Sequence, residues 1–217
     1  MENTIYSNIN RNVLLLETFR FDPSSGFQNL ALHLERLEKS AKTLGFKFDN
    51  IKIDALLSKI SAPQALRCRL ALSREGDIDL QTTPIGQNPS HWRVAIFPTR
   101  LRSDDPWLRI KSTRRALYEE ARAALPQGID EWLFLNERDE LCEGTITNVF
   151  LHFEGDIWHT PHASCGCLPG VLRQKLLNNG NATEKVIPIT AVQNYRQISF
   201  GNSLRGQIVA ELVTLAT

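Results

Sequence analysis

The stretch CEGTITNVFLHF, residues 142–153, decides the fold of the second half of the chain. It is rich in β-branched and aromatic residues, so we predict strand here. Strands are also predicted at 92–97 and 131–135, and helices at 113–124 and from Gly170 to Gly180. This order of strands and helices favours an α+β fold over a doubly wound parallel sheet.

The first half is predicted to be a smaller α/β region built around one amphipathic helix. Leucine and alanine recur every three or four residues from Leu30 to Leu44, which makes one continuous apolar stripe, and Gly45 is a typical helix stop. The other predicted elements are a strand at 13–21, a second helix at 54–60, a strand at 66–73 and a strand at 78–81, with a further strand near 185–189 in the second half.

A domain boundary is predicted in the segment 82–90, which contains two prolines and a glycine. We therefore expect a small N-terminal domain at 1–84 and a larger C-terminal domain at 90–217.

Composition excludes several classes of partner. The 217 residues include 25 Lys and Arg against 24 Asp and Glu, so a net charge of +1 predicts no attraction to nucleic acid or anionic lipid. No apolar run approaches the roughly 18–20 residues that span a bilayer. The N-terminal residues lack the pattern of a signal peptide, and the four cysteines are therefore expected to be reduced thiols in a cytoplasmic protein.

Two charged residues stand beside apolar segments. Lys111 follows Ile110 just before a predicted helix, where desolvation would lower its pKa and make the amine a nucleophile or base. Glu143 stands at the edge of an apolar strand, where a carboxylate needs a partner such as a protonated ring nitrogen. Taken singly, Lys111 is more simply explained as a solvated lysine, and a glutamate that faces water explains Glu143 equally well.

Other segments suggest anion binding. Arg36 borders the apolar stripe of the first helix, although its spacing alone favours a solvated surface arginine. The segment LPGVLR at 168–173 begins a helix after a glycine, and the N–H groups at such an end attract phosphate. Gly201-Asn202-Ser203 offers further N–H and hydroxyl donors.

A zinc site is the competing interpretation of the segment HTPHASCGC at 159–167. His159, His162, Cys165 and Cys167 have the right chemistry for zinc ligands. However, structural zinc sites usually place their ligand pairs on separate turns, and Cys-x-Cys chelates poorly, so a plain loop is favoured.

Together these pieces resemble the class IV aminotransferases, the fold type IV enzymes that depend on pyridoxal 5′-phosphate (PLP). The motifs H-x-x-R-L, K-S-T-x-R, E-G-T-x-x-N-x-F, L-P-G-x-x-R and N-S-x-x-G occur in the order typical of that family, from Leu14 to about Leu212. The likeness is greatest to the 4-amino-4-deoxychorismate lyase domains of fused para-aminobenzoate synthases.

The resemblance implies a PLP-binding enzyme with the cofactor between its two domains. Lys111 would bind the cofactor covalently, and Glu143 would pair with its pyridine nitrogen. The phosphate would be bound by Arg36, the N–H groups of Val171 and Leu172, Ser203 and Asn202. Arg20 and Arg115 are the candidates for binding substrate carboxylates.

The resemblance also implies a homodimer and a reaction. The favoured reaction is the conversion of 4-amino-4-deoxychorismate to 4-aminobenzoate and pyruvate, a step of folate biosynthesis. The alternative is amino-acid transamination, and a second alternative is a non-catalytic PLP carrier or zinc-binding module. Two features depart from the family: the segment before the first strand is short, and Ala116 replaces the tyrosine of branched-chain transaminases, the nearest tyrosine being Tyr118. The second departure favours the lyase.

Overall fold

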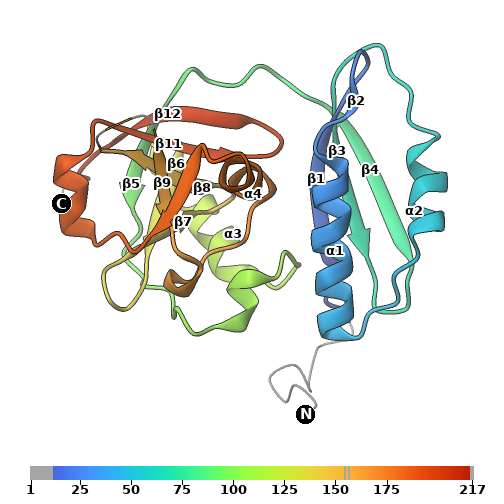
Figure 1. Ribbon diagram of the computed structural model, residues 1–217, viewed down its shortest axis with the longest axis horizontal. Helices are drawn as coiled ribbons and strands as arrows, with labels where there is room; N and C mark the ends of the chain where they lie inside the picture. Colours follow the sequence, from blue (N-terminus) through green and yellow to red (C-terminus); the bar gives the residue numbers. More distant parts are fainter. Residues whose placement is uncertain (1–11, 154, 156, 216–217) are drawn as a thin grey trace. The chain divides into compact units, whose positions relative to one another are not determined.

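The computed structural model describes residues 12–153, 155 and 157–215 (Figure 1). The N-terminal residues on which the signal-peptide prediction depends lie outside this range. No helix of the described residues is long and apolar enough to cross a membrane. The chain forms two compact units, one of residues 1–87 with 110–114 and one of 88–109 with 115–217.

The first unit is a four-stranded antiparallel sheet with two helices, and the strand order is β2-β1-β3-β4. Its elements are β1 (Leu15–Asp22), β2 (Gly26–Phe27), α1 (Leu30–Leu44), α2 (Asn50–Leu57), β3 (Leu66–Leu72) and β4 (Ile78–Pro84). Figure 1 shows α1 running along this sheet. The buried stripe of α1 includes Leu37, Ala41 and Leu44, and it provides the apolar face that the sheet needs.

The limits of α1 match the prediction. Gly45 adopts a left-handed conformation with φ of 70° and donates its N–H to the Ala41 carbonyl, so the helix ends where the glycine indicates. The prediction for α2 was shifted by several residues. Asp49 caps its N-terminus by accepting a hydrogen bond from the Lys52 N–H, and the helix therefore begins at Asn50 rather than Asp54.

The second unit is a mixed eight-stranded sheet, in the order β10-β9-β8-β11-β12-β5-β6-β7. Because β7 also pairs with β8, six of the strands close into a barrel. The strands are β5 (His91–Ile96), β6 (Glu131–Leu135), β7 (Leu141–Gly144), β8 (Asn148–His152), β9 (Trp158–Pro161), β10 (Ala182–Lys185), β11 (Gln197–Asn202) and β12 (Gly206–Leu212). The helical elements are η2 (Pro106–Arg109), α3 (Ala116–Ala123), η3 (Ala163–Cys165), α4 (Val171–Asn178) and η4 (Ile189–Asn194).

Alternate residues of the central strands enter two different cores. Leu133 and Leu135 of β6 pack in one apolar cluster, whereas Trp132 and Phe134 pack in another with Ala121 of α3. The Trp132 indole N–H donates to the Ala121 carbonyl at 2.7 Å. This two-sided burial explains why every residue of β6 is buried, and it fixes α3 against the outer face of the strand.

Besides α2, four predictions differ from the structure. The predicted strand 142–153 is divided into β7 and β8 by a turn at 145–147, and the predicted strand at 185–189 is replaced by β10, which ends at Lys185. The linker predicted from residue 82 begins later, because Thr82–Pro84 pair with β3. Helix α3 begins at Ala116 rather than Thr113, because the Thr113 N–H donates instead to the Leu14 carbonyl.

The segment 110–114 follows the predicted boundary in the sequence but packs with the first unit. Ser112 forms an isolated β-bridge with Leu15, and the Leu16 N–H donates to the Lys111 carbonyl at 2.9 Å. These contacts place Lys111 beside the start of β1.

Candidate active site

A buried polar triad occupies the interface of β1 and α1 in the first unit. Glu17 is 1% exposed and accepts hydrogen bonds from Arg36 Nε at 2.8 Å and Arg36 Nη2 at 2.6 Å. His33 Nδ1 lies 2.5 Å from Glu17 Oε2. Glu17 points to the same side of β1 as Leu15 and Phe19, so the alternation of the strand directs a carboxylate toward the helix. Arg36 is therefore half of a buried ion pair rather than a solvated surface residue.

The ionisation of this triad follows from its contacts. Burial raises the pKa of the Glu17 carboxyl, but the Arg36 guanidinium and the hydrogen bond with His33 outweigh it and lower the pKa to about 2. For His33, burial lowers the pKa below its ordinary value, and the charges of Arg36 and Lys111 lower it further. The hydrogen bond and the charge of Glu17 act in the opposite direction but are outweighed. Glu17 therefore stays ionised across the neutral range.

Stability should depend on pH through Glu17. Because the folded-state pKa lies below the ordinary value of 4.5, the charged carboxylate stabilises the fold above that value, and this contribution is lost as the pH falls from about 4.5 toward about 2. Glu17→Gln should therefore cost roughly 3 kcal/mol of unfolding free energy near neutrality, and the difference should shrink on acidification. Urea unfolding of the two proteins from pH 7 to pH 3 measures it. The exposed Glu38→Gln on the same helix is the control, and an E17Q deficit independent of pH would contradict the account.

Arg20, on the same strand, has a guanidinium N–H without a hydrogen-bond acceptor. Its Nε is buried and has no partner among the described residues, while Nη2 lies 3.4 Å from Asp22 Oδ2. A buried donor without an acceptor is unusual and costs stability. The Arg20 guanidinium is therefore a candidate for binding an anion.

Glu143 is the central acidic group of the second unit. It lies on β7, is 6% exposed, and accepts hydrogen bonds from Tyr118 Oη at 2.7 Å and from the Leu168 N–H at 3.0 Å. The carboxylate is thus held from two sides, by α3 and by the loop that precedes α4. Of the two interpretations left open by the sequence, the structure favours a partnered carboxylate over a glutamate that faces water.

The turn after Glu143 is organised by a second buried carboxylate. Glu131 is fully buried and accepts the Thr145 N–H at 3.0 Å, the Thr145 hydroxyl at 2.5 Å and the Thr147 hydroxyl at 3.1 Å. A side chain at Gly144 would place its Cβ only 2.3 Å from Thr147 Oγ1, so glycine is required here. The E-G-T-x-T pattern is therefore a turn built around Glu131, which sets the position of Glu143.

One face of α3 also contacts this turn. Arg115 Nη2 donates to the Thr145 carbonyl at 2.8 Å and Arg122 Nη1 donates to the Thr145 hydroxyl at 3.0 Å. With Tyr118, these residues follow the spacing of a single helix face. The predicted role of Arg115 in binding a substrate carboxylate stays a prediction, and in this structure its guanidinium is engaged with the turn.

The N-terminus of α4 has the features predicted for a phosphate site. Its N-cap residue is Gly170, which has no side chain to cap the first-turn N–H groups of Val171 and Leu172. A Cβ at Gly170 would lie 1.9 Å from the Asn148 amide oxygen, and the Asn148 amide N–H donates to the Leu168 carbonyl at 2.9 Å. The close approach of Asn148 thus holds the start of the helix against β8.

Asn202 and Ser203 lie in the turn that joins β11 to β12. The Asn202 side chain accepts the N–H groups of Leu204 and Arg205 and donates to the Ile146 carbonyl at 3.1 Å. Ser203 is buried. Asn202 therefore connects this turn to the turn that follows Glu143, within the same unit.

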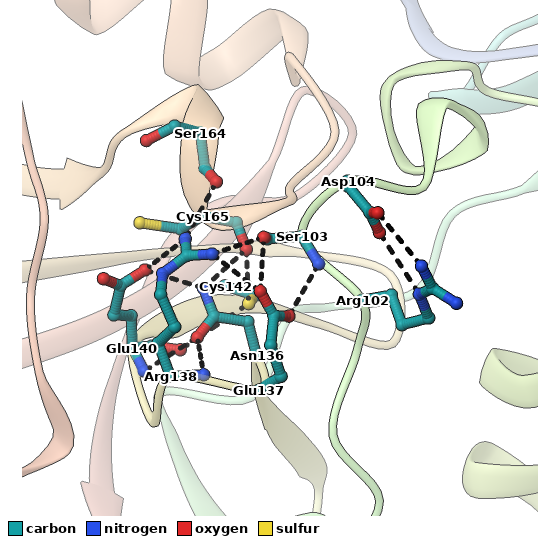
Figure 2. A network of polar contacts seen from close by, with 10 residues as sticks. All are labelled: Arg102, Ser103, Asp104, Asn136, Glu137, Arg138, Glu140, Cys142, Ser164 and Cys165. Atoms are coloured by element: carbon teal, nitrogen blue, oxygen red, sulfur yellow. Dashed lines mark hydrogen bonds and ion pairs between the residues drawn. The ribbon is translucent and has the colours of Figure 1, made fainter.

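A polar network fixes the loop between β9 and α4 (Figure 2). The amide of Asn136 and the thiol of Cys142 both donate to the Cys165 carbonyl, each at 3.1 Å. A side chain at Gly166, where φ is 86°, would meet Ser103 Cα at 2.9 Å. Neighbouring residues of β7 thus hold the loop at two points, Cys142 at Cys165 and Glu143 at Leu168.

The four possible zinc ligands of this loop are not brought together among the described residues. Within the described part of the chain, no three His, Cys, Asp or Glu side chains are grouped to hold a metal ion. His159 pairs with Thr183, and His162 with Ser164. Burial raises the pKa of Cys165 to about 11 and that of Cys167 to about 12, so both are thiols in this structure. These four residues therefore do not form a group of metal ligands in the described structure.

Comparison with known proteins agrees with this fold and these motifs. The family model of the amino-transferase class IV matches residues 14–211. A Mesorhizobium loti structure, provisionally named an amino-acid aminotransferase, is 42% identical and superposes with a TM-score of 0.89 over 93% of this chain and 100% of that one. A Schizosaccharomyces pombe protein, provisionally named an aminodeoxychorismate lyase, is 30% identical over 81% of this chain and 80% of its own length. The PLP-bound form of a hypothetical aminotransferase from Mycobacterium tuberculosis shares the fold, with a TM-score of 0.78 at 15% identity over 92% of this chain and 81% of that one.

A barrel unit and an antiparallel sheet unit together make up the α+β fold of PLP-dependent class IV enzymes. The chain belongs to the class IV aminotransferase family. It is therefore an enzyme of that family rather than a non-catalytic carrier, and the predicted fold class is confirmed.

Sequence reasoning missed the partners of the predicted residues. Glu17 was a detectable candidate, because a carboxylate in the apolar run 13–21 signals a buried pair. Tyr118 was detectable from its spacing three residues after Arg115, which puts both on one helix face. The role of Glu131 has no signal in the sequence alone, because it depends on the pairing of β6 with β7.

Proposed function

We propose that this protein is a PLP-dependent lyase that converts 4-amino-4-deoxychorismate to 4-aminobenzoate and pyruvate. Glu143 carries the proposal: a buried carboxylate with two hydrogen-bond donors already in place suits a partner for a protonated pyridine nitrogen. The family is PLP-dependent, which supports the choice of cofactor.

The donors present suit the rest of that cofactor. A dianionic phosphate favours a guanidinium and an uncapped helix N-terminus, so we assign it to Arg36, whose guanidinium also pairs with Glu17, and to the start of α4. We assign Asn202 and Ser203 to the same phosphate. Lys111 is assigned to the aldehyde, because it is the lysine of the K-S-T-x-R motif and the β1 pairing fixes its backbone. Bound PLP supplies an electron sink for charge that develops at the substrate carbon.

Individual side chains of the protein would have the following roles in the reaction. Lys111 Nζ removes the proton from the substrate carbon that bears the nitrogen. Glu143 keeps the proton on the ring nitrogen, and the buried Arg20 Nε donates to a substrate carboxylate. Loss of the substrate proton and departure of pyruvate leave an aromatic ring, which favours the lyase reaction.

A second candidate function is amino-acid transamination. The similarity to the Mesorhizobium loti protein favours it, since that protein is provisionally named an amino-acid aminotransferase. Two observations favour the lyase. One is the similarity to the Schizosaccharomyces pombe protein. The other is that Ala116 stands five residues after Lys111, where branched-chain transaminases have a tyrosine.

One assay separates the two reactions. The purified, PLP-loaded protein is offered 4-amino-4-deoxychorismate and, separately, L- and D-amino acids with a keto acceptor. We expect 4-aminobenzoate and pyruvate in equal amounts from the first substrate. Keto-acid exchange on an amino acid, with no 4-aminobenzoate formed, would replace the lyase by the transaminase.

We also propose that the protein acts as a homodimer, as the resemblance to class IV enzymes implies. Light scattering of the purified protein tests it, and a mass of one chain at micromolar concentration would contradict it.

A further inference from the structure

Tyr118 is partly buried and contacts Glu143 through its hydroxyl group. Its hydroxyl donates to Glu143 Oε1 at 2.7 Å, while its ring packs against Phe134 with centroids 5.0 Å apart. Helix α3 holds the residue in place, because the same face contacts the turn after Glu143 through Arg115 and Arg122.

The direction of this hydrogen bond is fixed by the chemistry of the two groups. Burial and the negative charge of Glu143 raise the pKa of Tyr118 well above its ordinary value, so the phenol keeps its proton. A phenol that keeps its proton donates to the carboxylate rather than accepting from it. The donors to Glu143 therefore include the Tyr118 hydroxyl and the Leu168 N–H.

We propose that Tyr118 is a positioning residue that acts through Glu143, holding the carboxylate charged so that a proton shared with a ring nitrogen stays on the nitrogen. Hydrogen bonds donated to a carboxylate favour its charged form, and a carboxylate without them competes more strongly for a shared proton. A ring nitrogen that loses its proton is a weaker electron sink. The inference rests on the proposed role of Glu143 as the partner of the PLP ring.

The test is a double-mutant cycle on the PLP-loaded protein. Tyr118→Phe removes only the hydroxyl and keeps the ring beside Phe134, so the fold should persist. We expect kcat to fall about tenfold with little change in KM, because a hydrogen bond to a charged group is lost. The absorption spectrum of the bound cofactor should change, while its dissociation constant stays within about threefold, because the phosphate contacts are intact.

The pairing itself is tested by combining substitutions. Tyr118→Phe combined with Glu143→Gln should be no slower than Glu143→Gln alone, because the hydroxyl acts only through the carboxylate. Tyr195→Phe removes the hydroxyl of another partly buried tyrosine in the same unit and should leave kcat and the spectrum unchanged.

Three results would overturn the inference. Wild-type kcat and spectrum in Tyr118→Phe would show that the hydroxyl does not act through Glu143. Losses that multiply in the double variant would show that Tyr118 acts by another route. Wild-type turnover of Glu143→Gln would instead overturn the proposed role of Glu143, and the inference with it.

Discussion

Lys111→Ala is expected to lower turnover by about 10³-fold or more, on whichever substrate the enzyme uses. Proton transfer by a positioned side chain contributes roughly 10²–10⁴-fold, and this variant loses that transfer and the covalent attachment of the cofactor together. Stability should change less than turnover, because the variant keeps the Lys111 carbonyl that accepts the Leu16 N–H and the contacts of Thr113 with Leu14. Steady-state kinetics and thermal unfolding of the purified variant measure the two effects.

A matched control is Lys42→Ala, which removes an exposed lysine from the end of α1 in the same unit. It should retain wild-type turnover. If Lys111→Ala is as active as this control when PLP is present in excess, Lys111 is not the catalytic lysine.

Glu143→Gln is expected to lower turnover by about 10²-fold, the scale of losing one preorganised electrostatic group in an active site. Glutamine keeps the size of the side chain and can still accept from Tyr118, but it cannot balance the charge of a protonated ring. Affinity for PLP should fall far less, within about tenfold, because Arg36, the start of α4 and Lys111 are unchanged. Turnover should therefore fall more than affinity, since the lost interaction strengthens as charge enters the ring.

The structure adds a control for this variant. Only one of the two amide positions of glutamine accepts a hydrogen bond, so either Tyr118 or the Leu168 N–H loses its acceptor. Thermal unfolding of the cofactor-free variant measures that structural cost separately from catalysis. A variant with wild-type turnover on every active substrate would make Glu143 a structural strand-end carboxylate.

Local elements of the first unit could be predicted because local patterns determine them. Helix α1 has a complete apolar stripe and a glycine stop, and its limits agree with the structure. Helix α2 has no such stripe, so its start depends on the cap at Asp49 and was misplaced. The start of α3 was misplaced for a different reason: Thr113 pairs with Leu14, a contact 99 residues away in the sequence.

The candidate residues could be selected from motifs, but their partners depend on tertiary structure. Arg36 seemed a surface arginine from its spacing, and it is paired because β1 brings Glu17 beneath it. The division of 142–153 into two strands was not predicted either, although Gly144 and Asn148 at the break are residue types that strands disfavour. The break requires Glu131 from β6, which accepts the hydrogen bonds of the turn.

The most direct test of the account is the site of cofactor attachment. The protein is incubated with PLP, reduced with borohydride, digested and mapped by mass spectrometry. The account predicts a yellow protein before reduction and one modified peptide, with the pyridoxyl group on Lys111. Stoichiometric modification of Lys42, Lys175 or any other lysine, with Lys111 unmodified, would contradict it.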